Sequence, residues 1–124
     1  MRVRIDPLDK LVSEYVRKRA MRRAGGCERC LTPKTSWKEL QACHFHGRSR
    51  RSVRYDESNL CGLCFGCHQY LDSHAMEKVE FFKQLLGEEK FDLLNCRMRN
   101  TWPKPDKKML MIYFTQKIEE LDAD

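Results

Sequence analysis

Long apolar runs are absent from this sequence. None approaches the roughly 20 residues needed to cross a bilayer, and the first residues, MRVRIDPLDK, lack the apolar stretch of a secretory signal. Internal repeats and low-complexity segments are also missing, and a charged content of 34% beside the hydrophobic content excludes a disordered tail as the main part of the chain. With 124 residues and 41% hydrophobic content, the chain can fill one core but not two. We therefore expect a single soluble domain over residues 1–124, in the cytoplasm and with no membrane partner.

Acidic residues are scarce in the N-terminal half. Residues 1–54 contain 15 Lys and Arg against 5 Asp and Glu, whereas residues 55–124 contain 9 against 13. A basic segment beside a charge-balanced one indicates a surface that binds phosphate groups. A polyanion such as DNA is therefore the expected partner, and a merely solvated helix face is the alternative.

Cysteine, in contrast, is abundant. Seven cysteines, an odd number, in a chain without an export signal argue against a disulfide scaffold and favour metal binding. Two Cys-x2-Cys pairs can each form a short turn that directs both thiolates at one point, and together they supply four ligands for a tetrahedral Zn²⁺. The predicted ligands are Cys27, Cys30, Cys64 and Cys67. Cys61 and Cys64 have the same spacing and form an alternative second pair.

Apolar residues recur with a helical period in the outer parts of the chain. A first helix is expected over 8–23, with Pro7 in its first turn and Gly25 just past its end. This helix is basic and supplies possible contacts to DNA at Arg17, Arg22 and Arg23. The pattern is helical again over 74–121, where a glycine and a Trp-Pro-Lys-Pro segment separate three helices, and Asp72-Ser73 is a candidate cap for the first of them.

The middle of the chain favours strands. Alternation from Trp37 to His46 predicts a first strand, and Val53 and Tyr55 predict a second, joined by a long exposed loop. A short helix over 65–71 follows. The loop is expected to hold phosphate through Arg48, Arg50, Arg51 and Arg54. The predicted fold is therefore α+β, a zinc-bound core over 27–71 flanked by helices on both sides.

Four segments of this core occur in an order that resembles the HNH endonucleases. They are Cys27-Glu28-Arg29-Cys30, Cys43-His44-Phe45-His46, Asn59-Leu60-Cys61-Gly62-Leu63-Cys64 and Phe65-Gly66-Cys67-His68. The most specific part is the tail Asn-Leu-x2-Leu-Cys-x2-Cys-His. The resemblance implies the ββα-metal fold, structural zinc at Cys64 and Cys67 in preference to Cys61, and a catalytic metal bound by His68.

A longer resemblance, to the NinG (Rap) group of phage recombination proteins, extends beyond the core. It includes His44-Phe45-His46-Gly47-Arg48, Arg54-Tyr55-Asp56-Glu57-Ser58-Asn59 and Phe82-Lys83-Gln84-Leu85-Leu86-Gly87. It implies cleavage of branched DNA, such as Holliday junctions, in a phage or prophage. Symmetric cleavage of a junction needs two active sites and therefore a homodimer. The alternatives are an HNH nickase that acts on duplex DNA and a zinc-dependent DNA-binding module without catalysis.

Phosphodiester hydrolysis assigns roles to the remaining residues. A neutral histidine can take a proton from water near pH 7, and a divalent metal can stabilise the charge that develops on the phosphate. We expect His44 to be the base and Mg²⁺ or Mn²⁺ to be the metal, while Asn59 either braces the loop behind the base or joins the metal shell. The second metal ligand is open: His46 is preferred to Cys43, whose thiolate would favour Zn²⁺.

Overall fold

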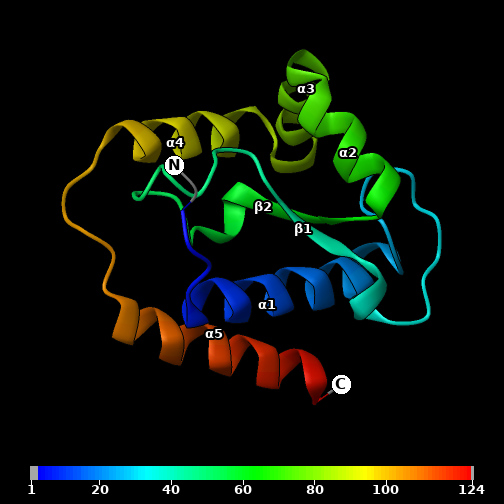
Figure 1. Ribbon diagram of the computed structural model, residues 1–124, viewed down its shortest axis with the longest axis horizontal. Helices are drawn as coiled ribbons and strands as arrows, with labels where there is room; N and C mark the ends of the chain where they lie inside the picture. Colours follow the sequence, from blue (N-terminus) through cyan, green and yellow to red (C-terminus); the bar gives the residue numbers. More distant parts are fainter. Residues whose placement is uncertain (1–2, 124) are drawn as a thin grey trace.

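A small antiparallel sheet lies between two groups of helices (Figure 1). The computed structural model describes residues 3–123, and in this range it contains five α-helices, two short 3-10 helices and two strands. Their order is α1 (Pro7–Ala24), η1 (Trp37–Glu39), β1 (Gln41–His44), η2 (Glu57–Asn59), β2 (Leu60–Leu63), α2 (Phe65–Ser73), α3 (Ala75–Leu86), α4 (Glu88–Arg99) and α5 (Lys107–Asp122). The predicted α+β class is therefore confirmed. No helix in this range is long and apolar enough to cross a membrane.

Local capping determines both ends of α1. The Asp6 carboxylate accepts a hydrogen bond from the Asp9 N–H at 2.7 Å, and the Asp9 carboxylate accepts one from the Asp6 N–H at 2.8 Å. This capping box satisfies two N–H groups that have no partner within the helix. At the other end Gly25 has a φ of 67°, and its N–H donates to the Met21 carbonyl at 2.9 Å. The helix matches the predicted range 8–23 to within one residue at each end.

The sheet pairs β1 with β2 in antiparallel register, with Cys43 opposite Cys61 and His44 opposite Leu60. α1 packs closely on this sheet: a Cβ atom at Gly62 would lie 2.5 Å from the Cβ of Ala20. α5 lies beside α1 and completes the lower layer, while α2, α3 and α4 lie on the other side of the sheet (Figure 1). Buried apolar clusters fill both sides, so the strands are held between two cores.

The second strand lies later in the chain than the alternation predicts. Residues 51–55 form turns, in which the Val53 N–H donates to the Arg50 carbonyl. The side chains of Val53 and Tyr55 are buried, but they belong to these turns and not to a strand. The first strand is also shorter, because Ser36 caps a 3-10 turn before it. α2 continues to Ser73, past the predicted end at residue 71, and His74 occupies the cap position before α3. The predicted Asp72-Ser73 cap is therefore wrong.

Candidate metal centre and active site

Two tight turns bring four sulfur atoms together at one end of the sheet. The Sγ atoms of Cys27, Cys30, Cys64 and Cys67 all lie within 4.8 Å of one another. The distance between the Sγ atoms of Cys30 and Cys64 is 3.8 Å. In a tetrahedral site with Zn–S bonds of about 2.3 Å, neighbouring sulfurs lie about 3.8 Å apart. The cluster therefore fits a structural metal such as zinc, and its members are the predicted ones.

Backbone contacts position each cysteine pair. In the first turn the Leu31 N–H donates to the Cys27 carbonyl at 3.0 Å, and Gly26 approaches Thr32 so closely that a Cβ atom would lie 2.1 Å from its carbonyl oxygen. In the second turn Cys64 caps α2, with its sulfur accepting a hydrogen bond from the Cys67 N–H at 3.5 Å. Both turns are thus closed by main-chain geometry that directs the sulfurs inward.

Glu28 joins the first cysteine pair to the sheet. Its N–H donates to the Gly62 carbonyl at 3.0 Å, and its buried carboxylate accepts from the Gly62 N–H at 2.7 Å. Because both groups bind the same residue of β2, the turn that carries Cys27 and Cys30 is fixed against the strand that leads to Cys64. The role of Glu28 has no signal in the sequence, because nothing near it in the chain indicates a contact to residue 62.

A second group of ligand-type side chains lies between β1 and α2. A sulfur of Cys43, a ring nitrogen of His68 and a carboxylate oxygen of Asp72 lie within 4.8 Å of one another. His68 Nε2 is 3.2 Å from Asp72 Oδ2, and His68 Nδ1 is 2.7 Å from Gln41 Oε1. When Nδ1 donates to the Gln41 oxygen, the lone pair of Nε2 is free to bind a metal. One nitrogen, one oxygen and one sulfur donor are a set that a divalent transition metal can accept.

Cys43 supplies the sulfur atom of this group. A hydrogen bond with the Cys61 thiol lowers the pKa of the Cys43 thiol to about 6, and a hydrogen bond with His68 adds to the effect against the opposing influence of burial. The hydrogen bond with Cys43 also raises the pKa of His68 above its ordinary value. The sulfur is therefore readily ionised, as a metal ligand must be.

Asp72 was missed as a site residue. It lies four residues after His68 and therefore on the same helical face. The signal was present in the sequence, but the predicted helix ended at residue 71, so that Asp72 was interpreted as a cap. The continuation of α2 to Ser73 is what brings its carboxylate beside His68.

The two predicted catalytic histidines line the same hollow. His44, at the end of β1, and His68, on α2, border an open cavity of about 440 Å³ together with Asp72 and Arg48. Burial lowers the pKa of His44 to about 4, and the positive charge of Arg48 contributes to the shift. The His44 imidazole is therefore neutral near pH 7 and has a lone pair available to accept a proton.

Asn59 holds the chain that follows His44. Its side chain is fully buried, with Oδ1 accepting from the His46 N–H at 2.8 Å and Nδ2 donating to the His46 carbonyl at 2.9 Å. Its own carbonyl accepts from the Phe45 N–H at 2.8 Å. The amide is fully engaged with the backbone, so of the two roles considered for Asn59 the geometry matches the brace and not the metal shell.

His46 lies outside this hollow. Its Nε2 is 2.8 Å from Asn95 Oδ1 on α4, and its ring packs edge-on against Phe45 with centroids 4.6 Å apart. The strand ends at His44, so strand alternation no longer places His46 on the same face as His44. The structure therefore brings Cys43, and not the preferred His46, beside His68.

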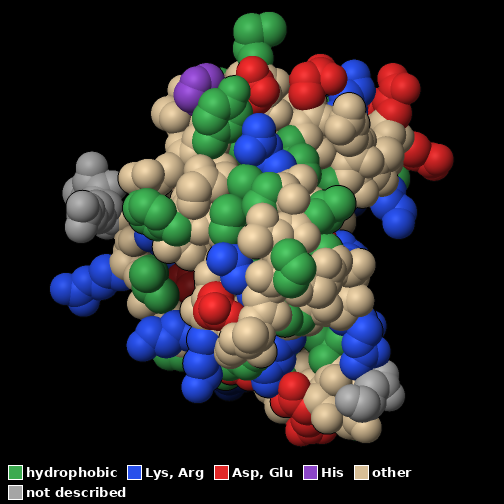
Figure 2. All heavy atoms as spheres, turned by 90° about the vertical axis from the view of Figure 1, so that its right-hand side faces the viewer, with side chains coloured by type: hydrophobic (Ala, Val, Ile, Leu, Met, Phe, Trp, Pro, Cys, Tyr) green, Lys and Arg blue, Asp and Glu red, His purple; other side chains and the backbone are tan. Residues whose placement is uncertain are grey.

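The arginines predicted to contact DNA differ in their availability. Arg54 is held by the N-terminal part of the chain, with Nε donating to Asp9 Oδ1 at 3.0 Å and Nη2 to the Arg4 carbonyl at 2.7 Å. On α1, Arg17 lies over the Trp37 ring at 4.6 Å. The other two predicted DNA contacts on α1 are also held by neighbouring residues. Arg22 donates to the Leu121 carbonyl at 3.0 Å, and the Arg23 guanidinium lies 3.6 Å from the Glu28 carboxylate. Figure 2, which faces this end of the molecule, shows Lys and Arg side chains gathered in its lower half.

The loop after β1 carries the arginines that are free to bind a ligand. Arg48 borders the hollow of His44, and Arg50 and Arg51 are exposed. The site thus combines a four-cysteine cluster that could hold zinc, a mixed group of ligand-type side chains, a neutral imidazole and an adjacent basic loop. No family model, curated protein or solved structure matches the chain.

Proposed function

We propose that this protein is a metal-dependent endonuclease that hydrolyses phosphodiester bonds in DNA. The observation that supports it is that His44, His68, Asp72 and Arg48 line one and the same hollow. A structural zinc centre alone needs neither a neutral imidazole nor a second ligand group. The resemblance of residues 27–70 to the HNH endonucleases agrees with this combination.

Each side chain has a defined part in the reaction. Neutral His44 accepts a proton from the attacking water. Cys43, His68 and Asp72 would hold a divalent ion, which when bound stabilises the charge on the phosphate and on the leaving oxygen. Arg48 orients the scissile phosphate through its guanidinium group. The ion is Mg²⁺ or Mn²⁺, or Zn²⁺ if the Cys43 thiolate decides the selectivity.

We further propose that the substrate is branched DNA, such as a Holliday junction in phage or prophage recombination. The resemblance to the NinG group supports branched DNA as the substrate, and the basic N-terminal half supports binding of a polyanion. Cleavage of both arms would require a homodimer, because residues 3–123 form one hollow that contains His44 and His68.

The test is cleavage of DNA by the purified protein and by two histidine variants. Supercoiled plasmid, linear duplex, flaps and four-way junctions are each incubated with Mg²⁺, Mn²⁺ or Zn²⁺. We expect His44→Ala to lower the cleavage rate by roughly 10²- to 10⁴-fold while DNA binding is kept. His74→Ala is the matched control, because His74 is exposed and stacks on Tyr70 away from the hollow. Equal rates in wild type and His44→Ala would refute the proposal.

A zinc-dependent DNA-binding module is the second candidate, and the four-cysteine cluster favours it, because such a cluster is sufficient for a binding domain. The same assays separate the two. A protein that binds DNA but cuts none of these substrates with any of the metals is a binding module, and one that only nicks duplex DNA is a nickase.

A further inference from the structure

A second basic hollow adjoins the proposed active site. It has a volume of about 650 Å³ and lies between the loop over 49–55 and the segment over 101–107. Ser49 lines both this hollow and the one that contains His44 and His68. The loop that begins at Gly47 therefore borders both hollows.

The charged side chains that line this hollow are all positive. Of the described residues, none with a carboxylate lines it, whereas five cationic residues do: Arg50, Arg51, Arg54, Lys104 and Lys107. Arg54 is paired with Asp9, and Lys107 with Asp6 at 3.1 Å. Within residues 3–123, Arg50, Arg51 and Lys104 make no side-chain hydrogen bond or ion pair, so their charges remain available for an anionic ligand.

Trp102 lies among these cations with its side chain 74% exposed. A large aromatic ring left in water beside unpaired cations is the combination that binds unpaired nucleotides, because the ring stacks on a base while the cations bind phosphates. In duplex DNA each base is already stacked and paired. A ring at the surface can reach the face of a base only where the base is unpaired.

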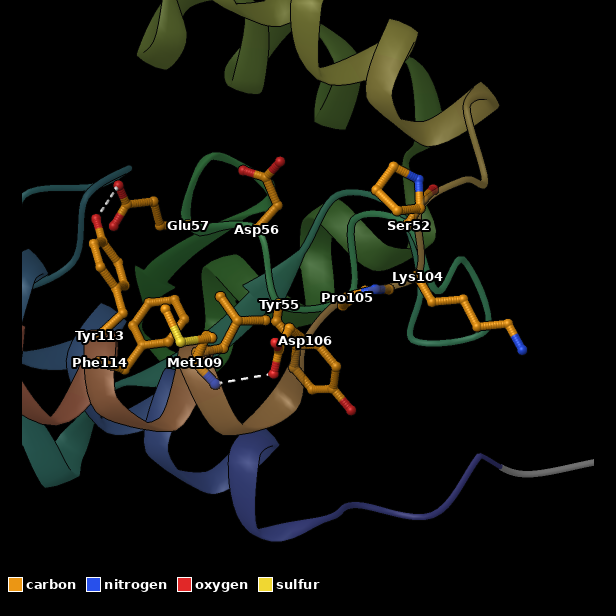
Figure 3. Close-up of a pocket in the computed structure, with 12 residues that line it drawn as sticks. Ser52, Tyr55, Asp56, Glu57, Lys104, Pro105, Asp106, Met109, Tyr113 and Phe114 are labelled. Atoms are coloured by element: carbon orange, nitrogen blue, oxygen red, sulfur yellow. Dashed lines mark hydrogen bonds between the residues drawn. The ribbon is translucent and has the colours of Figure 1, made fainter.

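The neighbouring hollow on the other side of the 103–106 segment has the opposite character. Asp56, Glu57 and Asp106 line it, and Asp56 is paired with Arg97 at 2.6 Å. Lys104 lines both hollows and extends away from Asp56 and Glu57 (Figure 3). Carboxylates repel a phosphate backbone. The polypeptide segment that contains Pro105 therefore separates an acidic hollow from the basic one, and only the basic one suits DNA.

We propose that the hollow between Arg50, Arg51 and Trp102 binds an unpaired nucleotide of a single-stranded DNA segment. The base stacks on Trp102, and Arg50 and Arg51 bind the flanking phosphates, with the same strand continuing into the hollow of His44. The inference rests on the proposed nuclease function for its biological substrate. It specifies that substrate as DNA with an unpaired stretch beside the scissile phosphate.

Tryptophan fluorescence tests the stacking directly. The chain has two tryptophans, so Trp37→Phe leaves Trp102 as the sole source of tryptophan emission when excitation lies beyond the absorption of the four tyrosines. This variant is titrated with a short oligothymidylate, with an abasic strand of equal length and with a blunt duplex, without added Mg²⁺ or Mn²⁺. We expect the oligothymidylate to quench the fluorescence and the abasic strand to bind without quenching. Absence of quenching by the oligothymidylate, or equal quenching by the abasic strand, would overturn the proposal.

Affinity gives the second readout. Trp102→Ala is expected to weaken binding of a labelled oligothymidylate by roughly 5- to 150-fold, the effect of losing one base-stacking contact. Met76→Ala, which removes another exposed apolar side chain, on α3, is the control and is expected to bind as wild type does. Unchanged affinity of Trp102→Ala would overturn the proposal even if the protein cleaves DNA. Because binding is measured without turnover, failure of the nuclease hypothesis would not produce that result.

Discussion

Asn59 illustrates how one side chain determines the geometry of the site. It is fully buried, and it binds both backbone groups of His46 and, through its carbonyl, the N–H of Phe45. An amide has one acceptor and one donor group in the arrangement that a single residue's N–H and carbonyl require. No other side chain of this size offers the same pair, which explains why an asparagine occupies the position before β2.

We predict that Asn59→Ala lowers the free energy of unfolding by about 1–3 kcal/mol, because it leaves the His46 N–H and carbonyl without their partner. Chemical denaturation measures the change. Asn95→Ala removes only the contact to the His46 ring and is expected to cost less. If Asn59→Ala is as stable as wild type, the brace does not hold the loop.

The pKa of Asp6 gives the stability a defined dependence on pH. Burial alone would raise this pKa, but hydrogen bonds from Tyr55 and the Asp9 N–H and the charge of Lys107 lower it below its ordinary value of 3.8. A carboxyl whose pKa is lower in the folded state stabilises the protein above its unfolded pKa and loses this contribution as the pH falls below that value.

Asp6→Asn should therefore be less stable than wild type at pH 7, by about 1 kcal/mol, because it keeps the helix cap but loses the charge. The difference is expected to shrink as the pH falls from about 5 towards 2, because Asp6 becomes protonated in the unfolded chain while the lower pKa of the folded state still keeps it ionised. Thermal unfolding at a series of pH values tests this. A difference that stays constant over the series would show that the carboxylate charge contributes nothing.

The elements differ in how well the sequence predicts them, and the difference follows from where their determinants lie. α1 is determined locally, by Asp6 at its start and Gly25 at its end, and its range is predicted closely. β2 depends on distant partners: Arg19 donates to the Leu60 carbonyl at 2.7 Å, and Glu28 binds Gly62. Such contacts leave no periodic signal, so the second strand was assigned to the wrong residues.

Packing between α1 and β2 makes Gly62 sensitive to substitution. Gly62→Ala would bring two Cβ atoms to 2.5 Å at Ala20, so the helix must move away from the sheet. We expect a loss of about 1–3 kcal/mol in the free energy of unfolding. Gly47→Ala is the matched control, because a Cβ atom there meets nothing within 4 Å.

The double variant Gly62→Ala with Ala20→Gly checks the cause. It removes the clash and is expected to recover part of the lost stability, less the cost of about 1 kcal/mol for a glycine inside a helix. Additive losses in the double variant would show that the two residues are not in contact.

At the scale of the whole molecule, the sequence predicts those parts of the site whose ligands lie close together in the chain. The four cysteines were found because each pair closes a local turn. The group of Cys43, His68 and Asp72 was found only in part, because it depends on the length of α2 and on the end of β1. The basic hollow with Trp102 was not found, because it joins segments about 50 residues apart in the chain.

The four-cysteine cluster, which could hold a structural zinc, connects three parts of the molecule, since its members follow α1, follow β2 and lie on α2. Loss of the metal should therefore release the layers on both sides of the sheet. Because the ligands are thiolates brought together only by folding, binding of the metal and folding are coupled.

The number of zinc ions bound per purified chain, measured by native mass spectrometry, tests this most directly. We predict one tightly held ion in the wild type and in Cys96→Ser, whose cysteine is exposed on α4 outside the cluster. Cys64→Ser is predicted to bind no zinc and to lack a cooperative unfolding transition. A folded wild type without zinc, or a Cys64→Ser variant that keeps both the ion and the stability of wild type, would contradict the account.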